Sequence, residues 1–210
     1  MQLVAVHRSD TFTRKHFFLN TDLLLKTLRA RVTVPDKEYQ EYIAMHQVRH
    51  FKKGEHVFRQ GDIPRHSIFI LKGCLRTYYI GTEGIERTIY FSEEGYWAGD
   101  LESMRKQEPS RQNLQALENT DALTVSRENW EIAYAKFEWL AANHAMGQQR
   151  RAIKLQEHIG KLLTDTPEIN YQRLLQERPA LLLRVPQHYI ASYLGITPET
   201  LSRIRKKMAS

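Results

Sequence analysis

Three polar residues near the C-terminal end of the chain, Glu199, Ser202 and Arg203, are spaced to fall within about one turn of a helix. The guanidinium group of Arg203 can donate two parallel hydrogen bonds to guanine O6 and N7, and Glu199 can accept one from the amino group of cytosine. This arrangement is typical of a helix that enters the major groove of DNA. We therefore interpret the three residues as candidates for contacts with base edges.

Four further residues around the same helix are suited to phosphate groups. Thr197 stands at its expected start, and Arg205, Lys206 and Lys207 follow near its end. Contacts with phosphates fix the register of a protein on DNA but carry no sequence information. We therefore expect these four residues to add affinity rather than specificity.

A second, shorter helix is expected to position the first. Residues 189–194 carry apolar side chains at three- and four-residue spacing, which indicates one apolar face. Gly195 suits the left-handed conformation that ends a helix, and Thr197 with Pro198 suits the start of the next one. The pattern predicts a helix-turn-helix. On this pattern alone, two ordinary helices with a solvated basic tail are an equally good interpretation.

The distribution of charge favours the first interpretation. The chain has 210 residues and a formal net charge of +7. Residues 141–210 contain 11 Lys and Arg against 5 Asp and Glu, whereas the first 140 residues contain 20 against 19. Nearly all of the excess positive charge therefore lies in the final third, as phosphate binding requires.

Other functional classes find little support in the sequence. The single cysteine, Cys74, excludes an internal disulfide and is expected to be a small core residue. His46 and His50 have no third ligand nearby, so we interpret them as surface histidines and expect no metal. No phosphate loop, nucleophile elbow or carboxylate pair indicates an enzyme. The longest apolar runs are too short to cross a membrane, and no signal peptide is evident, so we expect a cytoplasmic protein.

Upstream, the pattern predicts helices followed by short strands. Two helices are expected at Leu23–Leu28 and Lys37–Ala44. Strands separated by glycine turns are expected at His56–Arg59, Ser67–Leu71, Leu75–Ile80, Arg87–Phe91, Asn113–Leu117 and Ala122–Ser126. Closely spaced short strands of this kind favour an antiparallel barrel or sandwich.

A long helix is predicted over residues 141–163, which contain no proline. A stripe with coiled-coil spacing runs along it through Ala141, Ala145, Gln148, Ala152, Leu155, Ile159 and Leu162. Such a helix usually pairs with its own copy. The alternative is that the stripe packs on the β-region, although a second stripe (Met146, Ile153, Leu163) could serve that purpose. A further helix is expected from Thr166-Pro167 to Leu175, ended by Arg178-Pro179.

This order of elements resembles the CRP/FNR superfamily of bacterial transcription factors. The resemblance extends over nearly the whole chain from about Leu23. Part of it resembles a cyclic-nucleotide-binding domain, in the segments Phe51-Lys52-Lys53-Gly54-Glu55, Gln60-Gly61-Asp62 and Phe69 to Arg76. A second part resembles a Bacteroidetes-type branch of the family, in the stretch from Val185-Pro186-Gln187 through Thr197 to Arg203. The fumarate–nitrate type carries Glu, two residues, Ser and Arg in its DNA-reading helix, which here are Glu199, Ser202 and Arg203.

The resemblance implies an α+β fold with an N-terminal jelly-roll β-barrel, flanking helices, a long dimerisation helix and a C-terminal helix-turn-helix domain. The expected ranges are an extension at 1–22, the barrel domain at 23–137, the dimerisation helix at 138–164 and the DNA-binding domain at 165–210. The expected partners are a second copy of the chain, double-stranded DNA with a pseudo-palindromic site, and RNA polymerase. Because Pro198 stands where the cyclic-AMP-responsive branch has an arginine, we expect a half-site nearer TTGA than TGTGA.

The resemblance places an effector pocket at Gly99, Asp100, Ser110 and Arg111. Ligand-binding relatives hold the ribose with Gly-Glu and the cyclic phosphate with Arg-Ser, whereas this chain has Gly99-Asp100 and Pro109-Ser110-Arg111. Neighbouring residues of a strand face opposite ways, so Arg111 is a poor substitute. We expect no cofactor and no response to cyclic AMP. Two alternatives stay open: a sensor whose barrel ligand, a cyclic nucleotide or another small molecule, gates DNA binding, and a protein-interaction domain with an incidental basic helix.

Overall fold

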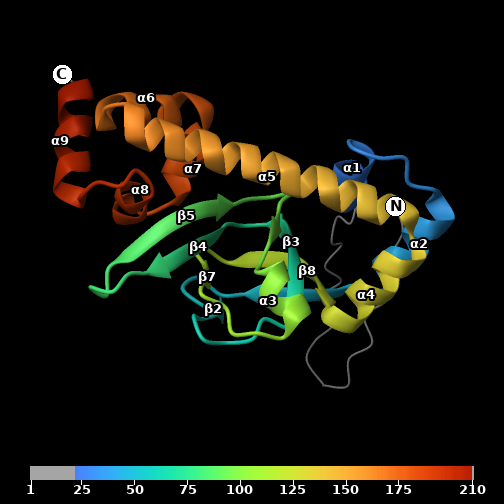
Figure 1. Cartoon of the computed structure of the whole chain (residues 1–210). Helices are drawn as coiled ribbons and strands as arrows, with labels where there is room; N and C mark the ends of the chain where they lie inside the picture. Colours follow the sequence, from blue (N-terminus) through green and yellow to red (C-terminus); the bar gives the residue numbers. More distant parts are fainter. Residues whose placement is uncertain (1–21, 210) are drawn as a thin grey trace, which may run out of the picture.

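The computed structural model describes residues 22–209. Helices α1 (Asp22–Arg29) and α2 (Asp36–Ala44) come first, followed by a region of β-strands (Figure 1). The long helix α5 (Glu138–Thr164) runs along one side of the strands and leads to the short helices of the C-terminal end. The predicted N-terminal extension lies outside the described residues, apart from residue 22.

The described strands form two antiparallel sheets. They are β1 (Gln47–Phe51), β2 (His56–Phe58), β3 (His66–Lys72), β4 (Leu75–Ile80), β5 (Glu86–Ser92), β6 (Trp97–Ala98), β7 (Asn113–Ala116) and β8 (Thr120–Ser126). One sheet has the order β1-β8-β3-β6 and the other β2-β7-β4-β5. Because strands distant in sequence are neighbours in both sheets, the region is a jelly roll, and the predicted fold class is confirmed.

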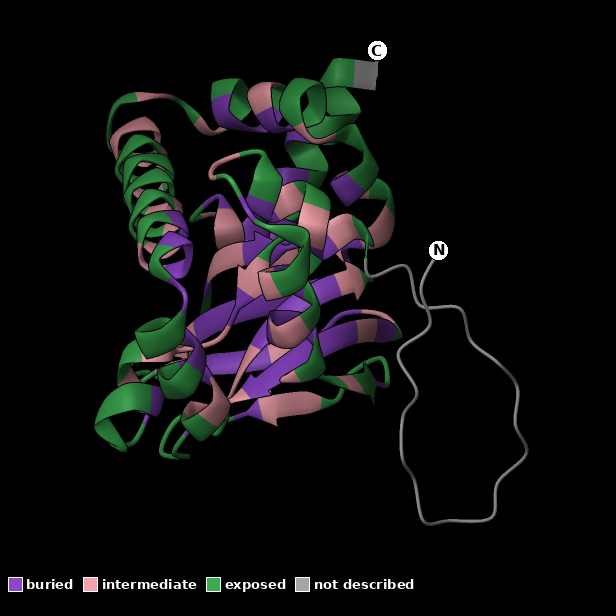
Figure 2. Cartoon of the chain, turned by 90° about the vertical axis from the view of Figure 1, so that its right-hand side faces the viewer, coloured by how far each residue is buried: buried purple, intermediate pink, exposed green. Residues whose placement is uncertain are grey.

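Apolar side chains of the two sheets meet between them. On β3, Ile68 and Ile70 join the core between the sheets with Leu75 of β4 and Leu114 of β7, whereas Phe69 belongs to a second cluster. This alternation follows from the two-residue period of a strand. Figure 2 shows the buried residues concentrated on these strands.

Helices cover the other side of the first sheet. Phe69 packs in one cluster with Leu24 and Leu28 of α1 and with Phe137, which connects α4 (Arg127–Lys136) to α5. All four side chains are at most 1% exposed. Leu24 and Leu28, four residues apart, therefore mark the face that anchors α1 to the sheet.

Gly73 forms the tight turn between β3 and β4. Its φ is +112°, and a Cβ atom at this position would lie 2.7 Å from Cα of Thr120. Only glycine fits both the backbone conformation and the contact. The next residue, Cys74, is fully buried, and this burial, with the nearby charge of Glu93, raises the pKa of its thiol to about 12. The expectation that Cys74 is a core residue is confirmed.

Beyond its first turn, where Trp139 and Leu140 are buried, helix α5 faces the roll with polar residues, contrary to one expectation. The second predicted stripe is wrong as a packing surface, because Met146, Ile153 and Leu163 are 42%, 47% and 81% exposed. Residues on the inner side are instead Asn143, which is buried, and Lys154, whose Nζ donates to the Tyr96 hydroxyl over 3.2 Å. Hydrophobic periodicity cannot reveal a contact made by polar groups.

Several short elements escaped prediction. Strands β1 and β6 and helix α3 (Leu101–Lys106) were not predicted, since segments of two to six residues carry little periodic signal. The predicted helix after Thr166 is α6 (Pro167–Glu177). Arg178-Pro179 does end α6, but Pro179 is also the first residue of a further helix, α7 (Pro179–Arg184), because proline suits the first helical position.

His46 is not a surface residue, so that interpretation is wrong. It is 7% exposed, its Nδ1–H donates to the carbonyl oxygen of Tyr42 over 2.9 Å, and its ring packs edge-on against that of Tyr42 at 4.6 Å. His50 pairs instead with Asp121, 2.6 Å from Nδ1 to Oδ1. No cluster of three or more His, Cys, Asp or Glu suited to a metal occurs among residues 22–209.

Burial of His46 should make folding stability depend on pH. Burial lowers its pKa from 6.5 to about 4. Between these values the unfolded chain binds the extra proton, so stability is lost as the pH falls from 6.5 towards 4. Between pH 7.5 and pH 5 we expect this residue alone to cost about 2 kcal/mol of unfolding free energy.

Urea denaturation at the two pH values measures this loss. The fall in unfolding free energy between pH 7.5 and pH 5 should be smaller in His46→Phe than in the parent protein. In the matched control His188→Gln, at an exposed histidine, the fall should equal that of the parent protein. Equal losses in the parent and in His46→Phe would contradict the account.

Candidate nucleic-acid interface

Helices α8 (Gln187–Tyr193) and α9 (Pro198–Ala209) form the predicted pair, joined by a tight turn. Gly195 has a φ of +68°. The N–H of Ile196 reaches back to the carbonyl of Ala191 over 3.0 Å, which closes the C-terminal end of α8. Thr197 then caps α9, since its Oγ1 accepts from the N–H of Thr200 over 3.2 Å.

One face of α9 is buried and the opposite face is exposed. Leu201 and Ile204 are 1% and 3% exposed and share a cluster with Ile190 and Leu194. The exposed set consists of the candidate base-contacting residues Glu199, Ser202 and Arg203 and the candidate phosphate-contacting residues Thr197, Arg205, Lys206 and Lys207. The structure thus leaves all seven side chains exposed.

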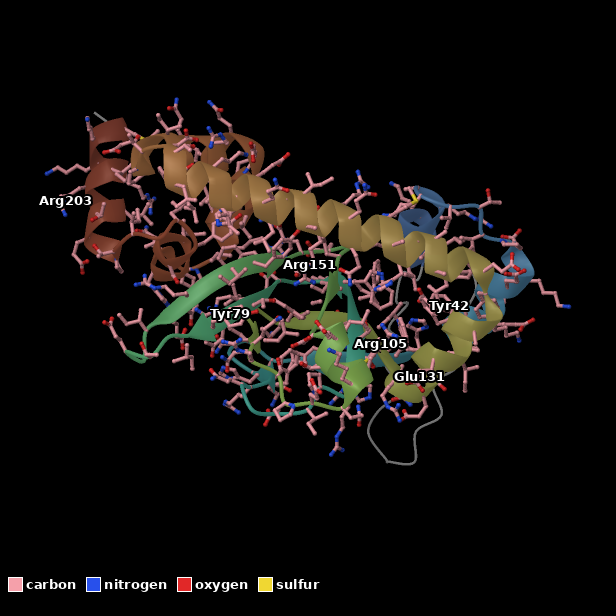
Figure 3. All side chains as sticks on the ribbon, viewed as in Figure 1. Tyr42, Tyr79, Arg105, Glu131, Arg151 and Arg203 are labelled. Carbon is pink, nitrogen blue, oxygen red and sulfur yellow. The ribbon has the colours of Figure 1, made fainter. Side chains whose placement is uncertain are left out.

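Glu199, Ser202, Arg203 and Lys206 lie at three- and four-residue spacing, so they share one strip of α9. The side chain of Arg203 points away from the body of the molecule (Figure 3). The pKa of the Glu199 carboxyl is lowered by a hydrogen bond from the backbone N–H of Glu199 itself and by a second with Thr197. Glu199 is therefore ionised at neutral pH and available as a hydrogen-bond acceptor.

The helix-turn-helix is docked on the outer side of the β4–β5 hairpin. Oγ of Ser192 in α8 accepts from the N–H of Thr88 and donates to the carbonyl of Glu86, both over 2.9 Å. The guanidinium of Arg76, a fully buried residue of β4, lies between the rings of Tyr78 (3.9 Å) and Tyr189 (3.7 Å). These contacts fix the position of α8 against β4 and β5.

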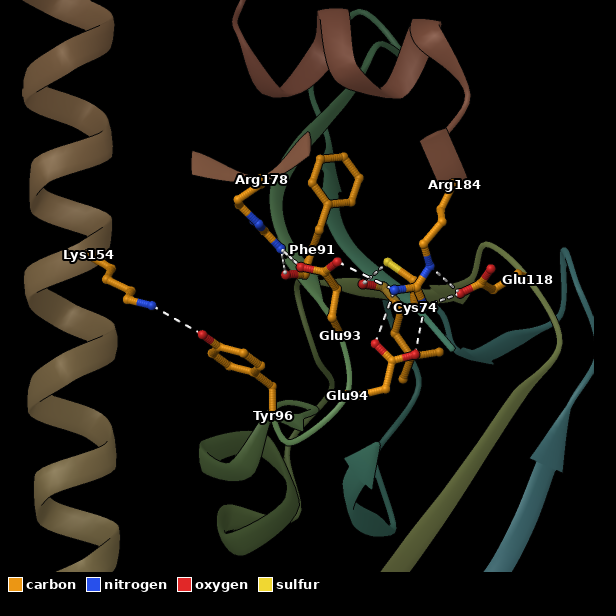
Figure 4. Close-up of polar contacts among 10 residues, drawn as sticks. Cys74, Phe91, Glu93, Glu94, Tyr96, Glu118, Lys154, Arg178 and Arg184 are labelled. Carbon is orange, nitrogen blue, oxygen red and sulfur yellow. Dashed lines mark hydrogen bonds and ion pairs between the residues drawn. The ribbon is translucent and has the colours of Figure 1, made fainter. Parts of the chain in front are cut away.

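Two arginines from the segment before α8 reach carboxylates of the β-region (Figure 4). Arg184 donates to both carboxylate oxygens of Glu94 at 2.8 and 3.0 Å and from Nε to Glu118 at 3.0 Å. Arg178 pairs with Glu93 and donates to the carbonyl of Phe91 at 3.1 Å. Hydrogen bonds to Glu94 and Glu118 raise the pKa of Arg184 above its ordinary value.

Sequence reasoning missed this arginine–glutamate cluster because its partners lie 66 to 90 residues apart. The available signal was weak: two arginines flank the otherwise apolar α7, and two adjacent glutamates follow β5. The cluster matters because it fixes the orientation of the candidate DNA-reading helix relative to the roll.

Removing Arg184 should therefore destabilise the whole chain. Arg184→Met leaves Glu94 and Glu118 without their cation, and we expect a loss of about 2 kcal/mol, allowing for partial exposure. Urea denaturation measures this. Lys106→Met, which removes an exposed ion pair within α3, is the control and should cost much less, because solvent screens an exposed pair. Similar losses in both variants would show that the cluster does not hold the domains together.

The residues predicted to form an effector pocket are largely occupied with one another. Asp100 caps α3 by accepting from the N–H of Ser103 over 3.1 Å. It also accepts from Oγ of Ser110, a residue 2% exposed, over 2.8 Å. Arg111 is exposed, and its side chain forms no hydrogen bond or ion pair with Asp100 or Ser110. Gly99, with a φ of +119°, precedes this group.

No helix within residues 22–209 combines the length and the apolar character that crossing a membrane demands.

Comparisons with known proteins agree with this architecture. Residues 48–137 match the cyclic nucleotide-binding domain family. The chain is 24% identical to a cyclic AMP receptor protein from Thermus thermophilus over 78% of this chain and 77% of that protein. It is 26% identical to a probable transcriptional regulator, flp, from Lacticaseibacillus casei over 79% of this chain and 78% of that protein.

Solved structures share the fold. FixK2 from Bradyrhizobium japonicum superposes with a TM-score of 0.68 at 19% identity, covering 78% of this chain and 84% of FixK2. The global regulator CLP from Xanthomonas campestris superposes with a TM-score of 0.70 at 14% identity, covering 83% of this chain and 92% of CLP. The roll, the long helix and the C-terminal helices thus recur together in other proteins.

Proposed function

Because the chain belongs to the CRP/FNR superfamily of transcriptional regulators, we propose that it works as a homodimer that binds a pseudo-palindromic DNA site through α9. The observation that carries the proposal is the exposed strip of Glu199, Ser202 and Arg203 on a helix whose other face is anchored. Such a helix can enter the major groove without disturbing its own core. Selection of preferred sites from randomised duplex DNA tests it.

The base contacts follow from the side chains on that strip. Arg203 is suited to a guanine, and Glu199 to a cytosine amino group. Pro198 offers no donor at the position before Glu199. These features support a half-site nearer TTGA than TGTGA. Thr197, Arg205, Lys206 and Lys207 are placed to approach the phosphates on either side of the groove.

An exposed stripe on α5 supports dimerisation. Ala145, Ala152 and Ile159 recur at seven-residue intervals and face away from the roll, with Ile159 48% exposed. Seven-residue recurrence of small and apolar residues is the pattern by which two parallel helices pack together. A dimer about this helix also places two copies of α9 on one DNA molecule, and RNA polymerase is the further partner that a regulator so bound would contact.

The proposed role involves no catalysis and places the protein in the cytoplasm, with the DNA. The residues at the position expected for a cyclic nucleotide support a protein that does not respond to one. Asp100 and Ser110 bind each other, and within residues 22–209 no arginine side chain is hydrogen-bonded to or ion-paired with either of them, as a cyclic phosphate would need.

Calorimetry with cyclic AMP and cyclic GMP should therefore show no binding at micromolar concentrations. The reason is the missing bidentate arginine, which typically supplies charged hydrogen bonds worth about 1.5–3 kcal/mol each. A dissociation constant in the low micromolar range for either nucleotide would contradict this part of the proposal.

A further inference from the structure

A cavity of about 650 Å³ opens at one edge of the roll, between β1, β2 and the connection from β2 to β3. β1 and β2 are terminal strands of the two sheets, and no ladder joins them among the described strands. The volume is within the range of sites that bind small molecules. Within residues 22–209 no residue of α5 or α9 lines the cavity, and neither do Gly99, Asp100, Ser110 and Arg111. It is therefore distinct from the predicted effector pocket and from the candidate DNA interface.

The floor of this cavity is apolar. Phe51, Phe58 and Ile68 line it, belong to the core between the sheets, and are at most 7% exposed. Val57 and Ile63 also line it, and Ile63 is 42% exposed. A large apolar side chain left exposed beside a buried apolar floor marks a surface that an apolar ligand can cover.

Arg49 stands where the geometry of the sheet would place an apolar side chain. It pairs with Ala122 of β8, which pairs in turn with Ile70 of β3, and both of these partners belong to the core between the sheets. Residues directly opposite each other in an antiparallel ladder project to the same face of the sheet. Arg49 therefore lines the cavity from the inward face of β1.

Two further groups that can carry positive charge line the cavity near Arg49. They are Arg65, in the connection before β3, and His66, the first residue of β3. The pKa of His66 is lowered by burial and then by the positive charge of Arg49, with a smaller effect of Arg65 in the same direction and an opposing one of Glu128. Neither arginine forms an ion pair with another residue of the described part of the chain. An anion at this position would offset their mutual repulsion.

Hydrogen bonds fix the wall of the cavity. The N–H of Gly61 donates to the carbonyl of Ser110, and the N–H of Ser110 donates to the carbonyl of Asp62, both over 2.8 Å. Asp62 supplies the one carboxylate among the described lining residues, and its Oδ2 already accepts from the N–H of Arg59 over 2.8 Å. The site is thus preformed, with an apolar floor and an excess of positive charge.

We propose that this cavity binds a small amphipathic anion, a carboxylate on an alkyl chain, with Arg49 and Arg65 donating hydrogen bonds to the carboxylate. Guanidinium groups suit this role because their paired N–H donors match the two oxygens of a carboxylate. The alkyl chain covers the apolar floor beside Val57 and Ile63. Binding does not depend on the proposed regulatory function, because it is measured on the protein without DNA.

Calorimetry on the full chain with octanoate, hexanoate, acetate and uncharged octan-1-ol tests the proposal. We expect octanoate to bind with a submillimolar dissociation constant and hexanoate to bind about tenfold more weakly, since each buried methylene contributes roughly three- to fourfold. Acetate should show no binding, and octan-1-ol should bind at least about tenfold more weakly than octanoate. Absence of octanoate binding, or equal affinity for octan-1-ol, would overturn the proposal.

Two arginine variants from separate elements locate the site. Arg49→Gln in β1 and Arg65→Gln before β3 should each weaken octanoate binding at least about fivefold. Both side chains are exposed, so we expect each variant to fold, and circular dichroism verifies it. Arg87→Gln, the same substitution at an exposed arginine of β5 outside the cavity, should leave binding unchanged. Unchanged binding in both cavity variants, or equal weakening by Arg87→Gln, would contradict the assignment.

Discussion

Replacing Arg203 by alanine is expected to remove most of the preference of the protein for its DNA site. Each bidentate contact between arginine and guanine discriminates by about 1–3 kcal/mol, and a dimer makes the contact twice. We expect the substitution to leave the fold intact, because Arg203 is exposed. Its 3.4 Å hydrogen bond goes to Thr200 of the same helix and so does not join α9 to the rest of the molecule. Fluorescence anisotropy with the preferred duplex and a scrambled duplex measures the ratio of affinities, which should fall towards one.

Lys206→Ala is the matched control, since Lys206 lies on the same helix, is exposed and is also basic. It should weaken binding to both duplexes alike and reduce the dependence of log affinity on log salt by about one for each phosphate that is no longer neutralised. If Arg203→Ala behaves like Lys206→Ala, Arg203 contacts a phosphate and the assignment of the base-reading strip is wrong.

Ala152→Glu is expected to separate the proposed dimer and with it most of the affinity for DNA. Ala152 is exposed and stands in the middle of the α5 stripe, so a parallel dimer would bring two glutamates together in a packed seam. Simultaneous binding of two half-sites by a dimer typically raises affinity about 10²–10⁴-fold, and a monomer lacks this gain. Sedimentation equilibrium gives the oligomeric state, and anisotropy gives the affinity for the full site.

Ala142→Glu provides the same chemical change at an exposed alanine of α5 that lies off the stripe. It should remain dimeric and bind DNA as the parent protein does. A monomeric parent protein that binds its site tightly would show that α5 does not form the dimer interface. The same conclusion would follow if both glutamate variants dissociated equally.

The candidate interface was predictable because its determinants are local. The cap at Thr197, the turn at Gly195 and the alternation of Leu201 and Ile204 with exposed polar residues all lie within about a dozen residues. The strands of the roll were predictable for a similar reason, since their apolar residues alternate between the two faces and glycines mark the turns. The order of the elements then led to the family resemblance, which implied how the strands form a jelly roll.

What escaped prediction depends on contacts between distant polar groups. Arg184 and Glu94 are 90 residues apart, and nothing in the neighbourhood of either residue specifies the other. Beyond its first turn the inner face of α5 is polar, so hydrophobic periodicity pointed to the wrong residues. His46 was wrongly predicted to be exposed, because a histidine beside a helix end can be buried when a backbone carbonyl accepts a hydrogen bond from its ring N–H.

Selection of binding sites from a pool of randomised duplex DNA tests whether a dimer of this protein reads DNA sequence through α9. We expect enrichment of an inverted repeat in which two TTGA-like half-sites lie about one helical turn, roughly 10 base pairs, apart. Arg203→Ala, selected in parallel, should lose that enrichment. A pool that gains no consensus after repeated rounds with the parent protein would contradict the account.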